Sequence, residues 1–307
     1  MQGFLNRYSI LAFGIGCLFT MKARAAGVDA FEARSWKINA SKSIPYRLFV
    51  PKNRVPGRKY PMMLALHGAG ERGNNNTSQL NNEFTNFWAN DSIQKDNPCF
   101  LVVPQCPLNE QWVSGPPPWD NYDFTKTPIT DDLKAVMDIL DSMEREFPID
   151  LDREYISGMS MGGAGTWYSI MMYPNRFAAA VPICGSSDPN QAKVLDAVNI
   201  WTFHEVDDPT IAVKNTQAMV KAIRAIGGSR LKYTEYPASL GYGHESWKPA
   251  AKDPELHRWV FSKVRAQATV IRPLRPDRYA GKLQVLGVDG LGRVRLRDDA
   301  SRLNFGD

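Results

Sequence analysis

Short apolar runs alternate with segments of helical periodicity over most of this 307-residue chain, from about residue 60 to residue 263. Continuous apolar runs bounded by turn residues are typical of parallel strands that are buried on both faces of a sheet. They lie at residues 60–66, 99–103, 155–156, 178–183, 200–203 and 231–236. The alternation therefore predicts an α/β fold, with helices on both faces of a mostly parallel central sheet and right-handed crossovers.

The segments between these runs supply the expected helices. Residues 129–140 repeat apolar side chains at helical spacing after a threonine and two aspartates, which suit a helix start. Residues 216–226 form a similar pattern that ends at two glycines. Earlier in the chain, residues 31–51 predict two antiparallel strands that meet near residues 39–42 and lie at the edge of the sheet.

The first 25 residues differ in composition from the rest. A positively charged start precedes the apolar run YSILAFGIGCLFTM and the small-residue pattern Ala23-Arg24-Ala25, which is typical of a secretory signal peptide. The run is shorter than the roughly 20 residues that cross a membrane. A lipoprotein signal at Cys17 is less favoured, because Gly14 stands where such signals usually carry a branched apolar residue. We expect a secreted or periplasmic protein, cleaved near Ala25, without a stable membrane span in the mature chain.

The formal net charge of +5 is unevenly distributed. Residues 1–25 and residues 266–307 each carry +3, so residues 26–265 carry about −1. A near-neutral body has no electrostatic footprint for DNA or RNA, and no nucleic-acid partner is expected. We predict one main domain over residues 26–265, and a separate tail at residues 266–307 whose two β-prone runs suggest a β-hairpin.

Three cysteines remain after removal of the signal: Cys99, Cys106 and Cys184. In an exported protein two of the three could form a disulfide, whose pairing is not readable from the sequence, and small buried cysteines are an equally good interpretation. The chain has neither Cys-x-x-Cys nor His-x-x-x-His spacing. The sequence therefore predicts no metal site and no cofactor.

The stretch ISGMSMGGAG, residues 156–165, places a serine within Gly-x-Ser-x-Gly. A β-prone run enters this turn and a helical pattern leaves it, as in a nucleophile elbow, where a Cβ on either glycine would collide with neighbouring backbone. Ser160 is therefore a candidate nucleophile. The pentapeptide by itself would also fit a simple tight turn, so the interpretation depends on finding its partners.

A serine hydroxyl needs a base, and histidine is the usual base near neutral pH. Among the four histidines, His244 is the best candidate, because it lies in a glycine-rich loop after the last expected strand. His67 begins the sequence His-Gly-Ala-Gly, which is similar to the oxyanion loop of esterases. His204 ends an expected strand, and His257 fits a structural role in a helix.

The base needs a carboxylate that orients its ring, and this residue should lie between serine and histidine in chain order. Glu205, Asp207 and Asp208 all directly follow an expected strand. In an open α/β sheet, ligands bind beyond the carboxyl ends of the strands. Each of the three is therefore a candidate for the acid on position alone.

These residues lie in segments with a recognisable order: LHGAGERG (66–73), VVPQCP (102–107), ISGMSMGGAGTW (156–167), AVPICG (180–185), FHEVDDPTIAV (203–213) and GHESW (243–247). Through them, residues 45–263 resemble the secreted α/β-hydrolases described as predicted peptidases or phospholipase and carboxylesterase-like proteins, which are related to feruloyl esterases and prolyl oligopeptidases. The chain departs from this pattern at Glu205, where relatives usually carry glycine, and beyond residue 266.

The resemblance implies specific roles for residues of this chain. Ser160, Asp208 and His244 fall on the positions of the catalytic triad. The backbone N–H groups of Met161 and Ala69 fall on the positions of the oxyanion hole. Residues 26–265 are accordingly expected to form an α/β-hydrolase catalytic domain.

The region beyond the nucleophile bears on the substrate. Only a short segment separates ICG (183–185) from NIW (199–201), which leaves no room for a large cap domain and predicts an open site. Trp112, Trp119 and Trp247 are candidate substrate contacts, because rings stack on sugars or aromatic acyl groups, although plain packing is as common. We predict a secreted serine carboxylesterase for carbohydrate-linked acyl esters, feruloyl or acetyl. The alternatives are a peptidase of the prolyl-oligopeptidase kind and a non-catalytic carbohydrate-binding protein.

Overall fold

The computed structural model describes residues 27–115, 120–265, 284–288 and 294–297, and the expected signal peptide lies outside them. The chain divides into two compact units, Met1–Ala266 and Gln267–Asp307. Within the described ranges, every helix is too short or too polar to cross a membrane.

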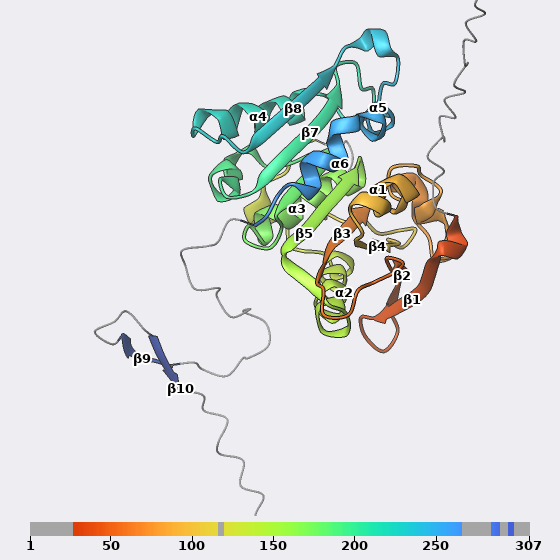
Figure 1. Ribbon diagram of the computed structural model, residues 1–307. Coiled ribbons are helices and arrows are strands. Elements are labelled where there is room, and N and C mark those ends of the chain that lie inside the picture. The colour runs from red at the N-terminus through yellow and green to blue at the C-terminus, as the bar shows by residue number, and fades with distance from the viewer. Residues whose placement is uncertain (1–26, 116–119, 266–283, 289–293, 298–307) are drawn as a thin grey trace, which may run out of the picture. The chain divides into compact units, whose positions relative to one another are not determined.

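The first unit is built on an eight-stranded sheet in the order β1-β2-β4-β3-β5-β6-β7-β8 (Figure 1). The strands are β1 (Phe31–Lys37), β2 (Ser43–Phe49), β3 (Tyr60–Leu66), β4 (Phe100–Pro104), β5 (Ile149–Met159), β6 (Ala179–Ile183), β7 (Asn199–Glu205) and β8 (Leu231–Tyr236). β2 runs antiparallel to β1 and β4, and the other neighbouring strands are parallel. The mostly parallel sheet, with an antiparallel pair at its edge, is confirmed.

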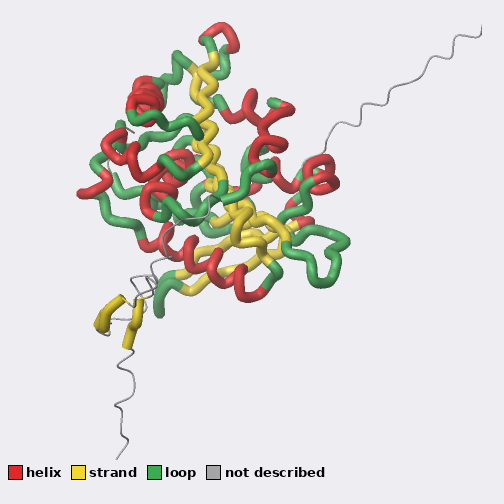
Figure 2. Tube along the Cα trace, turned by 60° about the vertical axis from the view of Figure 1, so that its left-hand side comes forward, coloured by secondary structure: helices red, strands yellow, loops and turns green. Residues whose placement is uncertain are grey.

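Helices cover both faces of the sheet (Figure 2). The α-helices are α1 (Asp91–Asp96), α2 (Asp131–Glu146), α3 (Met161–Met172), α4 (Lys214–Ala225), α5 (Trp247–Lys252) and α6 (Pro254–Phe261). Short 3-10 helices lie at Val28–Ala30, Ala69–Glu71, Ser78–Leu80, Phe87–Ala89, Phe124–Lys126, Pro189–Leu195 and Ala238–Leu240. Side chains of α2, α3 and α4 pack into one apolar core, and those of α1, α5 and α6 into another.

β3 shows why two cores form. All of its side chains are buried, and successive side chains of a strand point to opposite faces of the sheet. Met62, Leu64 and Leu66 join the core that contains α2, α3 and α4, whereas Met63 and Ala65 join the other. Because burying each large apolar side chain contributes about 1.5–3 kcal/mol, the continuous apolar run favours a strand covered on both sides.

Local capping interactions fix the ends of the helices. At the start of α2, the hydroxyl oxygen of Thr130 accepts the backbone N–H of Leu133 at 3.1 Å, which satisfies one of the orphan donors of the first turn. After α4, Gly227 has a φ of +79°, and the N–H of Gly228 returns to the carbonyl oxygen of Ile223 at 3.0 Å. These are the threonine start and the glycine stop that the sequence predicted.

β5 is longer than the sequence indicated. The apolar run covers only residues 155–156, whereas the strand spans Ile149–Met159. Residues 150–153 are partly exposed, and Asp150, Asp152 and Arg153 among them are charged; Arg153 Nε donates to Asp150 Oδ2 at 2.7 Å. Hydrophobic runs report burial on both faces, so the partly exposed first half of the strand left no continuous apolar run.

The second unit contains a β-hairpin. β9 (Gln284–Val288) and β10 (Val294–Arg297) pair antiparallel, with Val294 opposite Val288. The register shifts between Arg295 and Leu296. These strands occupy the β-prone runs from which a hairpin was expected in the tail.

Arg176 is the centre of a buried charge cluster in the first unit. Its guanidinium lies 2.8 Å from Glu154, 2.9 Å from Asp141 and 2.5 Å from Glu144. Three carboxyl groups thus share one positive charge. Burial raises the pKa of Glu154 to about 7, in spite of the attraction of Arg176.

A group whose pKa is higher in the folded than in the unfolded state stabilises the fold while it is protonated, and this contribution is lost as the pH rises through its folded pKa. For Glu154 the loss falls between about pH 4.5 and about pH 7. We expect wild-type protein to lose on the order of 2 kcal/mol more stability over this interval than Glu154→Gln. Urea unfolding of both proteins at pH 5 and pH 8 measures the difference, and parallel pH dependences would contradict it.

Candidate active site

Ser160 stands in a sharp turn between β5 and α3. Its φ is +54°, a conformation that costs a residue with a side chain about 1–3 kcal/mol. The turn is held because the N–H of Ser160 donates to the carbonyl oxygen of Ile183, the last residue of β6, at 2.9 Å. The partly exposed hydroxyl therefore stands at the carboxyl ends of parallel strands, where ligands bind in sheets of this type.

Two residues of this turn have no room for a side chain. A Cβ on Gly162 would lie 2.1 Å from the carbonyl oxygen of Leu66 in β3. A Cβ on Gly158 would lie 2.2 Å from the carbonyl oxygen of Gly162. These are backbone contacts that no rotamer change can relieve, so both glycines of Gly-x-Ser-x-Gly are needed for the reason that the sequence pattern predicted.

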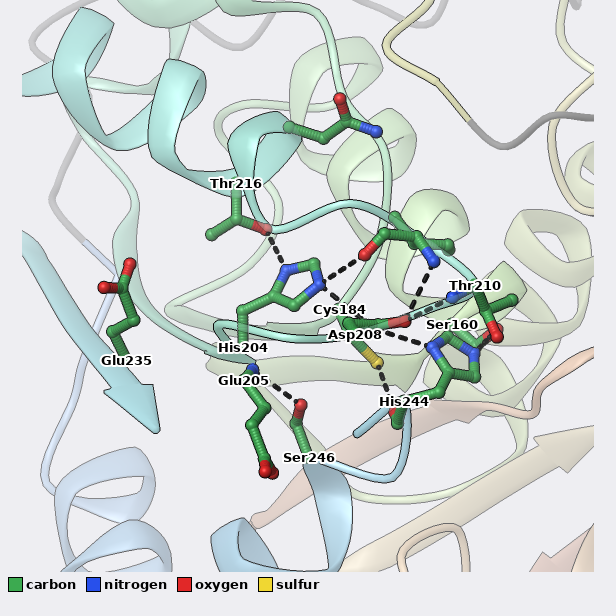
Figure 3. A network of polar contacts seen from close by, with 12 residues as sticks. Ser160, Cys184, His204, Glu205, Asp208, Thr210, Thr216, Glu235, His244 and Ser246 are labelled. Atoms are coloured by element: carbon green, nitrogen blue, oxygen red, sulfur yellow. Dashed lines mark hydrogen bonds and ion pairs between the residues drawn. The ribbon is translucent and has the colours of Figure 1, made fainter. Parts of the chain in front are cut away.

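The structure brings Ser160, His244 and Asp208 together (Figure 3). His244 Nε2 lies 2.8 Å from Ser160 Oγ, and His244 Nδ1 lies 2.8 Å from Asp208 Oδ2. The serine follows β5, the aspartate follows β7, and the histidine lies in the loop between β8 and α5. Of the three carboxylates that the sequence offered, Asp208 contacts the histidine, whereas Asp207 is exposed and Glu205 is buried beneath the loop. The geometry is that of a nucleophile, a base and an orienting acid.

Hydrogen bonds surround the carboxyl group of Asp208. Oδ1 accepts the backbone N–H groups of Thr210 and Ile211 at 2.8 and 2.9 Å. Oδ2 lies 2.8 Å from His244 Nδ1 and 3.1 Å from His204 Nε2. Burial acts to raise the pKa of Asp208, but the hydrogen bonds from His204, His244 and Ile211 outweigh it, so the pKa lies well below its usual value. The group is an anion at neutral pH and can stabilise a positive charge on His244.

His204 belongs to this network, although the sequence analysis placed it only at a strand end. Its Nε2 lies 2.8 Å from the carbonyl oxygen of Ile211, which can only accept, so Nε2 carries a proton that it also directs toward Asp208. In the neutral ring, Nδ1 accepts the hydroxyl proton of Thr216 at 2.7 Å. The sequence signal was its position at the end of a buried strand, four residues before the acid.

The loop after β3 lies against the serine. A Cβ on Gly68 would be 3.7 Å from Ser160 Cβ. Ala69 begins the 3-10 helix Ala69–Glu71, and Met161 is the first residue of α3. Because the first N–H groups of a helical segment have no acceptor within it, the N–H groups of Ala69 and Met161, predicted as the oxyanion hole, are free of hydrogen bonds within their own helices.

His67 holds this loop from the buried side. The N–H of Cys106 donates to His67 Nε2 at 2.9 Å, so the ring proton is on Nδ1, which donates to the carbonyl oxygen of Gly68 at 2.6 Å. Burial lowers the pKa of His67 to about 4. The ring therefore stays neutral near pH 7 and keeps this tautomer.

The three tryptophans expected to contact substrate have different positions. Trp112 is fully buried, and its indole N–H donates to the carbonyl oxygen of His67 at 3.0 Å. The expectation for Trp112 is therefore wrong, because its ring is part of the core. Trp247 is 8% exposed and packs edge-on against His244, with ring centroids 5.4 Å apart. Trp119 lies outside the described residues.

Cys99, Cys106 and Cys184 are all free and buried, so the disulfide considered for an exported chain does not form among them. One donor atom each of Cys184, Asp208 and His244 lies within 4.8 Å of the others. Burial raises the pKa of Cys184 well above its usual value, and its Sγ–H donates to the carbonyl oxygen of His244 at 3.4 Å. The Cys184 thiol therefore acts here as a hydrogen-bond donor to the loop that carries His244.

No protein-family model matches the chain. A bifunctional acetylxylan esterase/xylanase of Neocallimastix patriciarum is 27% identical over 177 residues, which are 58% of this chain and 23% of that protein. An Arabidopsis thaliana protein named "Probable carboxylesterase SOBER1-like" is 26% identical over 223 residues, which cover 67% of this chain and 80% of that protein. The crystal structure of a thermostable esterase is 40% identical with a TM-score of 0.71, and the match covers 78% of this chain and 64% of that one.

These likenesses agree with the sheet order and with the geometry around Ser160. The chain has the α/β-hydrolase fold, as its sequence predicted. Esterases are found among both the homologues and the structural neighbours of the chain, and peptidases are found among the structural neighbours. The esterases among them support a serine hydrolase. The chain spans 23% of the length of the first relative and 64% of the solved esterase.

The close approach at the turn can be tested by substitution. We expect Gly162→Ala to destabilise the fold by more than about 3 kcal/mol or to prevent folding, because the methyl group must displace the backbone of β3. Gly70→Ala is the matched control, since a Cβ there meets nothing within 4 Å. The urea midpoints of the two variants measure the effect, and equal midpoints would show that the turn can move away from β3.

Proposed function

We propose that this chain, an α/β-hydrolase by fold, is a serine carboxylic-ester hydrolase that works through Ser160, His244 and Asp208. The observation that carries the proposal is the unbroken chain of hydrogen bonds from Ser160 Oγ through the imidazole to Asp208, with 2.8 Å at each step. The esterases among the relatives support an ester as the substrate.

The arrangement assigns each proton in the reaction. His244 Nδ1 donates to the ionised Asp208, so Nε2 accepts the proton of Ser160 Oγ as this oxygen attacks the ester carbonyl carbon. The tetrahedral intermediate collapses when Nε2 returns the proton to the leaving oxygen, and the alcohol departs while the acyl group stays on Ser160. Water, deprotonated by His244, then attacks the acyl-enzyme. The carboxylic acid leaves and the serine hydroxyl is restored.

The backbone N–H groups of Met161 and Ala69 are assigned the role of stabilising the negative charge that forms on the carbonyl oxygen. In a trans peptide the C=O and N–H groups point in opposite directions. His67 Nδ1 donates to the carbonyl oxygen of Gly68. The N–H of Ala69, which belongs to the same peptide, therefore points away from His67. Fixed donors of this kind need no reorganisation during the reaction, and losing one typically lowers kcat about 10²–10³-fold.

The proposed substrates are carbohydrate-linked acyl esters, with acetyl or feruloyl as the acyl group. Residues 184–198, between β6 and β7, form only the 3-10 helix Pro189–Leu195, which is too little chain for a cap domain. A site uncovered on this side accepts an acyl group that projects from a polymer. The acetylxylan esterase/xylanase among the relatives supports the same substrate class.

The proposed function includes export, which is supported by the charged start, apolar run and Ala23-Arg24-Ala25 of the N-terminal segment. A chain expressed from the whole sequence in a bacterium with a secretion system is expected to lose this segment. Its mass, measured on protein from the periplasm or medium, should match a start near Ala26. Full-length protein retained inside the cell would contradict export.

Hydrolysis of p-nitrophenyl acetate, methyl ferulate and acetylated xylan tests the activity directly. We expect the wild type to cleave at least one of these esters. Ser160→Ala should lower kcat by about 10⁶-fold, because no nucleophile remains, and Asp208→Asn by about 10⁴-fold, because the ring loses its orienting anion.

A succinyl-Ala-Pro nitroanilide is the control substrate for a peptidase. Cleavage of the anilide alone would replace the esterase proposal. Activity that survives Ser160→Ala would remove the serine from the mechanism. Absence of both activities, without fluorophosphonate labelling of Ser160, would indicate a protein without catalysis.

A further inference from the structure

The loop that carries His244 has little regular structure of its own. It lies between the 3-10 helix Ala238–Leu240 and α5. Gly241 and Gly243 have φ values of +68° and +54°, which glycine adopts easily. Because glycine has no Cβ, these two residues could also adopt many other backbone conformations. The loop must therefore be held from outside if the imidazole is to keep its two hydrogen bonds.

Glu205, the last residue of β7, holds this loop on both sides of the histidine. Its contact with Ser246 is drawn in Figure 3. Its Oε1 accepts the backbone N–H of Tyr242, two residues before His244, at 3.0 Å. Its own backbone N–H donates to Ser246 Oγ, two residues after His244, at 3.0 Å. The glutamate side chain is fully buried, so these contacts are screened from water.

The same residue anchors the acid. The carbonyl oxygen of Glu205 accepts the backbone N–H of Asp208 at 3.3 Å. This bond closes the turn that presents the carboxylate to His244. One residue thus contacts both the turn of the acid and the loop of the base.

We propose that Glu205 is a positioning residue that fixes His244 relative to Asp208 and Ser160, an inference that rests on the proposed function of these three residues. It contacts none of the reacting atoms and acts through the loop backbone. Hydrogen bonds weaken steeply as their geometry worsens, and a misplacement of about 1 Å can lower turnover about 10²-fold. The thiol of Cys184 also donates to the carbonyl oxygen of His244 at 3.4 Å, and this is a weaker hydrogen bond.

The role depends on an acceptor oxygen. Glu205 Oε2 is buried without a hydrogen-bond partner in the described part of the chain. Glutamine keeps an oxygen that can accept the N–H of Tyr242 and loses only the unpartnered one, whereas alanine loses both. Comparing the two variants therefore separates the hydrogen bond from the charge.

The test measures kcat and KM for p-nitrophenyl acetate with the wild type, Glu205→Gln, Glu205→Ala and Ser246→Ala. Glu235→Ala is the matched control. Glu235 lies opposite His204 on the neighbouring strand β8, and it is exposed and bonded to Tyr233 and Gln217 instead of the loop. Thermal unfolding of each variant reports whether the fold is retained.

We expect Glu205→Ala to lower kcat about 10–100-fold while KM stays within about twofold, because the reacting groups are misplaced and the binding surface is not. Glu205→Gln should stay within about threefold of the wild type. Ser246→Ala should also lower kcat, since it removes the contact on the other side of His244. Glu235→Ala should match the wild type.

Wild-type kcat in Glu205→Ala would overturn the proposal, as would a loss in Glu205→Gln equal to that in Glu205→Ala. If Glu205→Ala does not fold, the proposal is tested with Ser246→Ala. An unchanged kcat in Ser246→Ala would then overturn the proposal. Failure of the proposed function gives a different result, which is a wild type without ester hydrolysis or a Ser160→Ala variant as active as the wild type.

Discussion

The packing of three backbone segments around Ser160 is the constraint on which the rest of the structure depends. The turn after β5 touches the end of β3 through Gly162 and the end of β6 through the N–H of Ser160. Both contacts require β3, β5 and β6 to be neighbours in the sheet, which is the observed order. Once these strands pair, the hydroxyl and the loop at Gly68 are brought to the same edge without any further element.

The proposed acid and base, Asp208 and His244, depend on electrostatics at the end of β7. Burial removes the hydration that stabilises the Asp208 carboxylate. The hydrogen bonds from the surrounding donors stabilise this anion by more than the hydration that is lost. Two of these donors are backbone N–H groups, which cannot ionise or rotate away. The remaining donors are His204 and His244. His204 is fixed by Thr216 and Ile211, whereas His244 lies between Asp208 and Ser160.

The sequence predicted the sheet, several of the helices that cover it, Ser160 and His244, because each leaves a local signal. Apolar runs mark strands buried on both faces, and polar residues directly after such runs lie at one edge of the sheet. Other features depend on neighbours distant in the chain. The partly exposed first half of β5 has no continuous apolar run. The burial of Trp112, whose indole N–H donates to the carbonyl oxygen of His67, depends on a residue far away in the chain. Choosing among Glu205, Asp207 and Asp208 required either the family resemblance or the distance to His244.

The two halves of the site are held by different kinds of contact. Around Ser160 the essential contacts are between backbone atoms, and any added side-chain atom at Gly158 or Gly162 breaks them. Around His244 the contacts are made by side chains, through the Glu205 carboxyl group and the Ser246 hydroxyl. Side chains can be exchanged without refolding a sheet, whereas a backbone contact cannot. It follows that substitutions can tune the placement of His244 in this fold, while Gly158 and Gly162 in the turn at Ser160 admit none.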